Sequence, residues 1–253
     1  MTSTTVQASG RGRGTGRRWS PWATVLLVGV VAFLVYVLPP YLSLDPARAR
    51  LQPMPDVAWF YPVLVTHIFL GSVVLLTGCL QVWPWLRRQH PRVHRWSGRT
   101  YVFACLPAAL CVIAIAPLGR MGPNQQVANT ALGVLWLITT VAGYRAARQR
   151  RFGAHREWMV RSFALSLSIV MNRFWSVVTI AVFSPEVLTG GPIDEVAFAQ
   201  AVGVGTWLSW VVNLLLAEWW LHRRPARRPR TVASPDPVVE GPSTGSGIVV
   251  GQA

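Results

Sequence analysis

Six stretches of the chain are almost wholly apolar, and the short segments between them hold nearly all of the charge. A helix that crosses a bilayer needs about 20 mostly apolar residues. Lipid offers no partner to backbone polar groups, and unbroken apolar runs favour helices over strands. The pattern therefore predicts an all-α integral membrane bundle of six transmembrane helices. The predicted spans are Trp22–Leu38, Ala58–Trp83, Gly98–Leu118, Gln126–Tyr144, Val160–Phe183 and Val196–Leu221.

The two ends of the chain differ in composition from this core. Residues 1–18 are rich in Ser, Thr, Gly and Arg, and residues 222–253 are rich in Pro and Arg. Such compositions bury too little apolar surface to fold. We therefore predict a disordered tail over 1–18, one six-helix domain over 19–221 and a second disordered tail over 222–253. The first apolar run lacks a small-residue cleavage site, so we expect it to be retained as a helix.

The arginines predict which way each span points. Twenty of the 24 arginines lie in four segments. These are the N-terminal tail, the second connection and the start of the third span, the fourth connection and the start of the fifth span, and the C-terminal tail. The other connections hold only Arg48, Arg50 and Arg120. Cytoplasmic segments of membrane proteins carry an excess of Lys and Arg. The sequence therefore predicts that both termini are cytoplasmic.

Composition supports a membrane protein and argues against nucleic-acid binding. Of 253 residues, 52% are hydrophobic and 13% are charged, whereas a soluble domain has about 25% charged residues. The net charge is +15, but the arginines flank apolar spans, so the expected partners are the bilayer and its anionic phospholipid headgroups. The three cysteines lie inside predicted spans and form no CxxC pair.

The second span carries a patterned face. With 3.6 residues per turn, His67, Gly71, Gly78 and Gln81 lie on one side of the helix. We expect both glycines to allow another helix to approach closely. An ionisable residue inside a span is a functional candidate, and the alternative for His67 is a neutral ring that hydrogen-bonds across the bundle.

Polar residues also interrupt the fifth and sixth spans. Arg173 follows Asn172 near the middle of the fifth, where an arginine costs roughly 2.5 to 3.5 kcal/mol. It should face the interior and find a partner there, such as a carbonyl, a water-filled cavity, an anion or a cofactor propionate. A helical stripe joins it to Ser162, Ser166 and Ser176. The sixth span adds Asn213 near mid-depth and Glu218 toward the inner surface.

The densest cluster lies at the predicted cytoplasmic mouth. Its candidate binding residues are His94, Arg95, Arg99, His155, Arg156 and Arg161. His94 and His155 are expected at one depth on two helices, so they could ligate one b-type haem whose propionates the arginines hold. Alternatively, the arginines and helix N-termini bind a phosphate or a lipid headgroup. A third interpretation is that these charges only set topology, with Glu157 and Arg161 paired four residues apart.

The run from His67 to Tyr101, with His94-Arg95-Trp96-Ser97-Gly98-Arg99 as its most specific part, resembles a known family. The family is that of predicted bacterial membrane proteins of unknown function called domain of unknown function 2306. A second resembling segment begins at His155, and the resemblance covers about residues 60–220. It implies a multi-helix core in a bacterial cell (plasma) membrane and no particular substrate. The chain is also similar to cytochrome b561-like proteins, which, unlike this chain, place paired histidines deep in their helices.

No motif predicts an enzyme. The sequence has no phosphate-binding loop, dinucleotide fingerprint, HExxH or GxSxG, so no catalytic or metal-ligating residue is proposed. Three hypotheses remain: a non-enzymatic protein that binds anionic lipid at its cytoplasmic mouth, a b-type haem protein for electron transfer, and a small proton-coupled transporter. The transporter would use His67, Arg173, Asn213 and Glu218, but Glu218 is the only carboxylate within a span.

Overall fold

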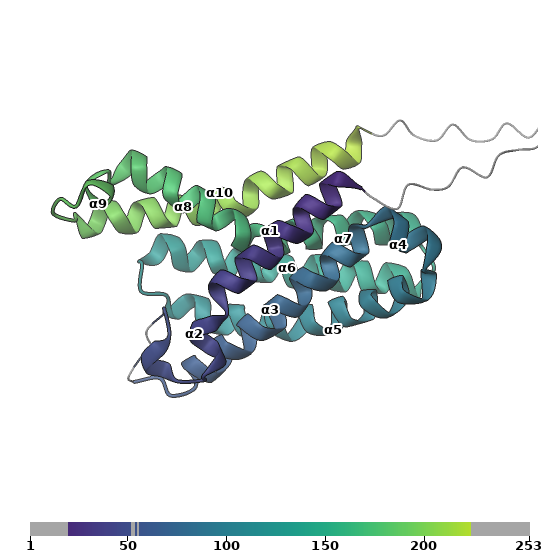
Figure 1. The fold of residues 1–253 in the computed structure, drawn as a ribbon, viewed down its shortest axis with the longest axis horizontal. Coiled ribbons are helices and arrows are strands. Elements are labelled where there is room, and N and C mark those ends of the chain that lie inside the picture. The colour runs from purple at the N-terminus through teal and green to yellow at the C-terminus, as the bar shows by residue number, and fades with distance from the viewer. Residues whose placement is uncertain (1–19, 52–53, 55, 224–253) are drawn as a thin grey trace, which may run out of the picture.

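The computed structural model describes residues 20–51, 54 and 56–223. Within these residues the regular secondary structure is helical throughout, with no strand (Figure 1). The all-α prediction is therefore confirmed. The predicted tail over 1–18 lies outside the described residues, as does 224–253 of the second tail.

Several helices are long and apolar enough to cross a membrane. Four qualify alone, and a fifth span is possible if α7 and α8, which meet at a bend of 44°, count as one. The apolar helix α1 is shorter, at 17 residues. The long helices are α1 (Pro21–Val37), α3 (Phe60–Val82), α5 (Pro91–Ile115), α6 (Pro123–Arg148), α7 (Phe152–Ser166), α8 (Ser168–Phe183) and α10 (Glu195–His222).

Short helices fill the connections, and prolines begin many of the elements. The short elements are α2 (Pro39–Leu42), η1 (Pro46–Arg48), α4 (Pro84–Gln89), η2 (Ala116–Leu118) and α9 (Glu186–Thr189). Proline suits a first helical position because its ring presets φ and the missing N–H would have no partner there. Pro91 thus begins α5, seven residues before the predicted start of this span at Gly98. Helix α10 begins instead after Asp194, whose carboxylate accepts hydrogen bonds from the backbone N–H groups of Val196 and Ala197.

The bend between α7 and α8 contains neither proline nor glycine. The Ser166 hydroxyl donates to the carbonyl of Ser162 on the preceding turn, a bond that tends to bend helices, and Leu167 lies at the break. Ser162 is buried whereas Arg173 is exposed. The bend of 44° lies between these two residues, and Ser166 before it and Arg173 after it both line one large cavity.

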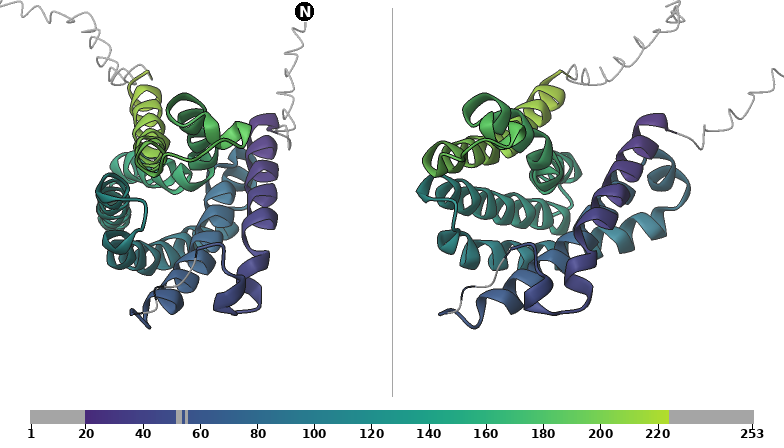
Figure 2. Two further views of the ribbon diagram at one scale, coloured as in Figure 1. Left: turned by 90° about the vertical axis from the view of Figure 1, so that its left-hand side faces the viewer. Right: turned by 60° about the vertical axis from the view of Figure 1, so that its left-hand side comes forward.

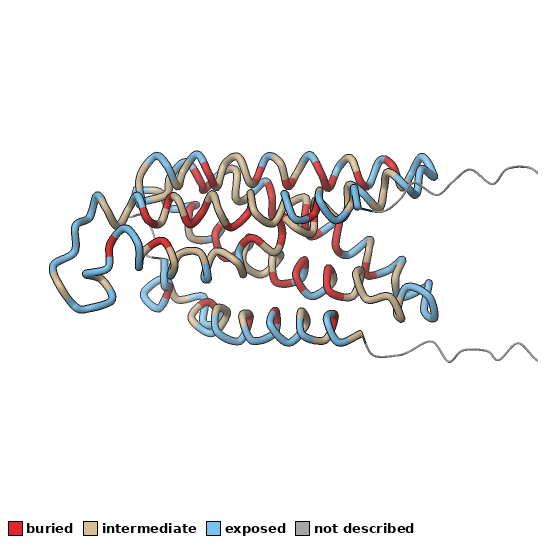
Figure 3. Tube along the Cα trace, turned by 90° about the horizontal axis from the view of Figure 1, so that it is seen from above, coloured by how far each residue is buried: buried red, intermediate tan, exposed pale blue. Residues whose placement is uncertain are grey.

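The long helices form a bundle around a core built mainly from α3, α5, α6, α7 and α10, and α1 lies along one side next to α3 (Figure 2). Buried positions gather inside the bundle, while its outer faces are exposed (Figure 3). Many exposed side chains are large and apolar, for example Phe103, Leu110 and Phe174. Lipid-facing positions of a membrane bundle have this character. The first and last described residues lie at the same end of the bundle as α4 (Figure 1).

Candidate functional site

At the end of the bundle that holds α4, a side-chain amide links α3 to the start of α5. The Nε2 amide of Gln81 donates to the His94 carbonyl oxygen over 2.8 Å and also to the Ser97 hydroxyl. His94 itself is half-buried, and its buried Nδ1 has no hydrogen-bond partner among the described residues. Further along α5, Tyr101 and Cys105 are buried.

His155 at the start of α7 is held differently. Its Nδ1–H donates to the carbonyl oxygen of Gly143 on α6 over 2.9 Å, which leaves Nε2 as the acceptor of the neutral ring. His155 lies within electrostatic range of His94, as does Arg87. The tertiary structure therefore brings the two predicted histidines toward each other from α5 and α7.

The four candidate arginines of this cluster fall into two groups. Arg95 and Arg99 are exposed, and the Arg99 guanidinium lies over the Trp96 ring, 5.4 Å from its centre. Arg156 lies over the ring of Trp220 on α10 at 4.9 Å. Arg161 forms an ion pair with Glu218. Of these four candidates, Arg95 and Arg99 are the exposed ones.

Besides Gln81, three of the predicted intramembrane polar residues are hydrogen-bonded to neighbouring helices. The His67 Nδ1–H donates to the Ala108 carbonyl oxygen over 2.8 Å, which is the cross-bundle bond that the sequence offered as an alternative. Its ring meets the Trp136 ring edge-on, with 6.4 Å between centres. The Asn213 amide donates to the Ala164 carbonyl oxygen over 3.1 Å. Glu218 is bound to Arg161.

Arg173 has the opposite environment. It is exposed, and it forms no ion pair with any described residue. It does line a cavity of about 690 Å³ that reaches from α1 and α3 across α6 to α8 and α10. His67 and Asn172 line the same cavity, whereas Gln81, Asn213 and Glu218 do not. The four residues of the predicted transport path therefore do not line a single cavity.

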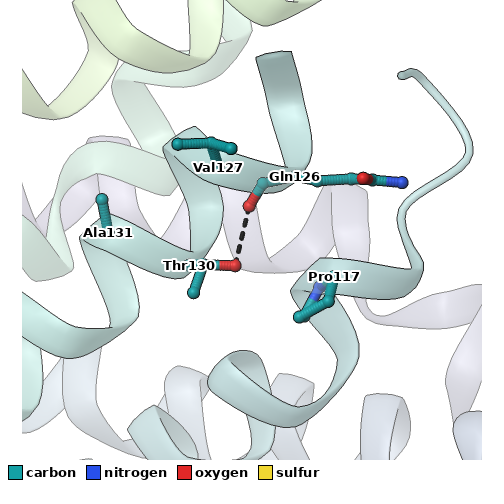
Figure 4. Close-up of a pocket in the computed structure, with 5 residues that line it drawn as sticks. All are labelled: Pro117, Gln126, Val127, Thr130 and Ala131. Atoms are coloured by element: carbon teal, nitrogen blue, oxygen red, sulfur yellow. Dashed lines mark hydrogen bonds between the residues drawn. The ribbon is translucent and has the colours of Figure 1, made fainter. Parts of the chain in front are cut away.

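A smaller hollow of about 390 Å³ lies between η2 and the start of α6 (Figure 4). The Thr130 hydroxyl there donates to the Gln126 carbonyl oxygen, and the Gln126 amide donates to the Gly119 carbonyl oxygen. Pro117, Val127 and Ala131 provide the remaining wall. Its polar groups are thus already bonded, and the large cavity is the better candidate for a ligand.

The structure contains a buried network of hydroxyl groups that the sequence did not lead us to expect. The Tyr101 hydroxyl lies 2.8 Å from the Ser162 oxygen and 2.9 Å from the Ser166 oxygen. Trp136 donates its indole N–H to Ser166, and Thr140 shares a hydrogen bond with Ser162. The network joins α5, α6 and α7. Small polar residues one turn apart inside apolar spans, as at Ser162 and Ser166, were the available signal.

The fold thus defines a helical membrane protein with several long apolar helices, two separate polar regions and, among the described residues, no group of three or more potential metal ligands. The chain belongs to the family described as predicted membrane protein DUF2306, whose model matches residues 64–221. The matched range contains His94 and His155 of the cytoplasmic mouth. It also contains His67 and Arg173. Neither a curated protein nor a solved structure matches the chain.

Proposed function

We propose that the chain crosses a bacterial plasma membrane six times, with both termini in the cytoplasm. Helix α1 is the first span. Its 17 helical residues extend roughly 26 Å, which is close to the hydrocarbon thickness of about 30 Å. Together α7 and α8 form one broken span. The shared position of the two described ends supports an even number of crossings (Figure 1).

The exposed arginines support the orientation. Ten of them lie near the helix ends that face α4 and the described chain ends: Arg87, Arg88, Arg92, Arg95, Arg99, Arg145, Arg148, Arg150, Arg151 and Arg223. The other end has Arg48, Arg50 and Arg120, accompanied by exposed carboxylates such as Glu186 and Asp194. The positive-inside rule then makes the α4 end cytoplasmic.

The function that this geometry supports best is binding of anionic phospholipid headgroups at the cytoplasmic mouth. The observation that carries it is the exposure of Arg95 and Arg99 on α5, beside the interfacial ring of Trp96. An arginine near an anionic surface contributes about 1 kcal/mol. These two guanidinium groups therefore favour an anionic over a zwitterionic lipid.

Cysteine labelling tests the orientation. Gln149 lies at the proposed cytoplasmic end and Thr189 at the other, and both are exposed. A membrane-impermeant maleimide added to intact cells should label Thr189→Cys and leave Gln149→Cys unlabelled until the cells are opened. The reverse labelling order would overturn the topology. The unsubstituted chain, with Cys79 and Cys105 buried, supplies the background.

Lipid competition tests the headgroup site. Native mass spectrometry of the protein with equal phosphatidylglycerol and phosphatidylcholine should show preferential retention of phosphatidylglycerol. Replacing both arginines, Arg95→Gln with Arg99→Gln, should remove most of the preference, whereas Arg48→Gln at the opposite end should preserve it. Equal retention of both lipids by the unsubstituted protein would refute the proposal.

A second candidate is b-type haem binding by His94 and His155. Two observations favour it. The Nδ1 atom of His94 is buried and has no hydrogen-bond partner among the described residues, and the His155 ring is oriented by the Gly143 carbonyl. On His155, the hydrogen bond from Nδ1–H to a backbone carbonyl orients the ring and leaves Nε2 free to ligate, as in most histidine metal ligands. Haem held there would carry one electron at a time.

A further inference from the structure

The cavity at the other end of the bundle has the size and walls of a ligand site. Its volume of about 690 Å³ falls within the range of roughly 300–1,000 Å³ that is typical of small-molecule pockets. Apolar side chains make up most of the wall, among them Phe33 on α1, Leu64 on α3, Leu132 on α6 and Ile169 on α8. Such walls suit an apolar chain rather than a polar solute.

The charge in this cavity has a single sign. Among the described residues, three arginines line it, Arg50, Arg120 and Arg173, and no carboxylate does. Arg50 is already engaged, because its guanidinium donates to the Tyr36 carbonyl oxygen over 2.8 Å and stacks on the Tyr36 ring. Arg120 and Arg173 form no ion pair with a described residue. Two cations within one mostly apolar cavity therefore lack a counter-ion from the part of the chain that the structure describes.

The hydroxyl groups that line the cavity do not compensate for this charge. Ser72 donates to the carbonyl oxygen of Ile68, and Thr206 donates to the carbonyl oxygen of Val202, each within its own helix. Ser166 is bonded within the buried hydroxyl network. An arginine inside a membrane span is costly unless it meets an anion or water, so the unpaired Arg173 points to an anionic partner.

We infer that this cavity binds an amphiphile with one apolar chain in its interior and one carboxylate or phosphate head against Arg173 and Arg120. The shared chemistry admits a long-chain fatty acid or an anionic phospholipid. This site is separate from the headgroup site at the cytoplasmic mouth, because none of the residues proposed there lines the cavity.

The chain offers a matched pair of variants to test occupancy. Gly71 lines the cavity, and a Cβ placed there would meet no atom within 4 Å. Gly29 on α1 is equally unobstructed but lies outside the cavity. A leucine at position 71 should fill space that the apolar chain needs, while a leucine at position 29 makes the same chemical change on an exposed face of α1.

The experiment uses the full chain in a neutral detergent with a fluorescent long-chain fatty acid as the probe, displaced by palmitate in one arm and by phosphatidylglycerol in the other. We expect saturable binding at one site per chain, weakened at least roughly tenfold by Gly71→Leu and by Arg173→Gln and unchanged by Gly29→Leu or Arg48→Gln. Displacement by palmitate alone identifies a fatty acid, and displacement by phosphatidylglycerol identifies a phospholipid.

Three results would overturn the inference: no saturable binding, equal binding by Gly71→Leu and Gly29→Leu, or displacement by hexadecanol as effective as by palmitate. The last result would show that the charge of the head group does not contribute to binding. Thermal unfolding of each variant separates loss of binding from loss of the fold. The cavity variants leave Arg95 and Arg99 unchanged. Failure of the cavity site therefore appears as absent fatty-acid binding, whereas failure of the headgroup site appears as equal retention of the two lipids.

Discussion

Arg161 on α7 and Glu218 on α10 form a two-point ion pair although they are 57 residues apart, with Nη2 of Arg161 2.9 Å from Oε2 of Glu218. The sequence had offered Glu157, one turn before Arg161, as the partner. That suggestion was wrong, because α10 brings a carboxylate into line with both guanidinium nitrogens. Two-point pairs of this kind are the strongest geometry for arginine and carboxylate.

Breaking this pair should destabilise the protein. Glu218→Gln leaves the Arg161 charge without its counter-ion, and a fully buried pair would lose about 3–5 kcal/mol. The two side chains are 19% and 32% exposed, so screening reduces the expected loss to about 1–2 kcal/mol. Thermal unfolding in detergent measures it. Glu157→Gln should be neutral, and equal losses for the two variants would contradict the assignment.

The buried hydroxyl of Tyr101 should also contribute to stability. Tyr101→Phe removes the group that lies between Ser162 and Ser166 while keeping the ring in place. We expect a loss of about 1 kcal/mol, since a net hydrogen bond between helices has this magnitude. Tyr144→Phe makes the same change at an exposed site on α6 and should cost nothing measurable. Unfolding midpoints that match for the two variants would exclude a stabilising role for the network.

Two glycines on α3 should respond oppositely to alanine. A Cβ at Gly78 would overlap the Phe163 ring, so Gly78→Ala should destabilise by about 1–3 kcal/mol. Gly71→Ala meets open space and should be neutral or slightly stabilising, because alanine favours a helix. The prediction that both glycines allow close helix approach thus holds for Gly78 and is wrong for Gly71. Detergent unfolding of both variants provides the comparison.

Haem binding at the cytoplasmic mouth has a direct spectroscopic test. Protein purified from haem-replete cells should show a Soret band with α and β bands on reduction. His94→Ala or His155→Ala should abolish the bands, whereas His67→Ala should keep them, since His67 lies on the cavity wall and not at the mouth. A colourless protein would exclude this candidate, and loss of the bands in His67→Ala alone would show that the ligands were wrongly chosen.

The class of protein and the approximate limits of its helices could be predicted from the amino-acid pattern alone. Apolar runs of span length have few alternatives in lipid, because every backbone polar group must be bonded within the segment. A proline at the first turn of a helix acts locally, as Pro91 does at the start of α5. His94 and His155 were assigned to one depth from the order of the spans alone.

Which polar groups meet depends on how the helices pack against one another. Glu218 rather than Glu157 binds Arg161, and Gly71 lines a cavity while Gly78 contacts Phe163, because helix rotation and the bend at Leu167 set these contacts. A helical period fixes which residues share a face but not what that face meets. The partner comes from packing between helices distant in the chain, and the periodicity of a single span carries no record of it.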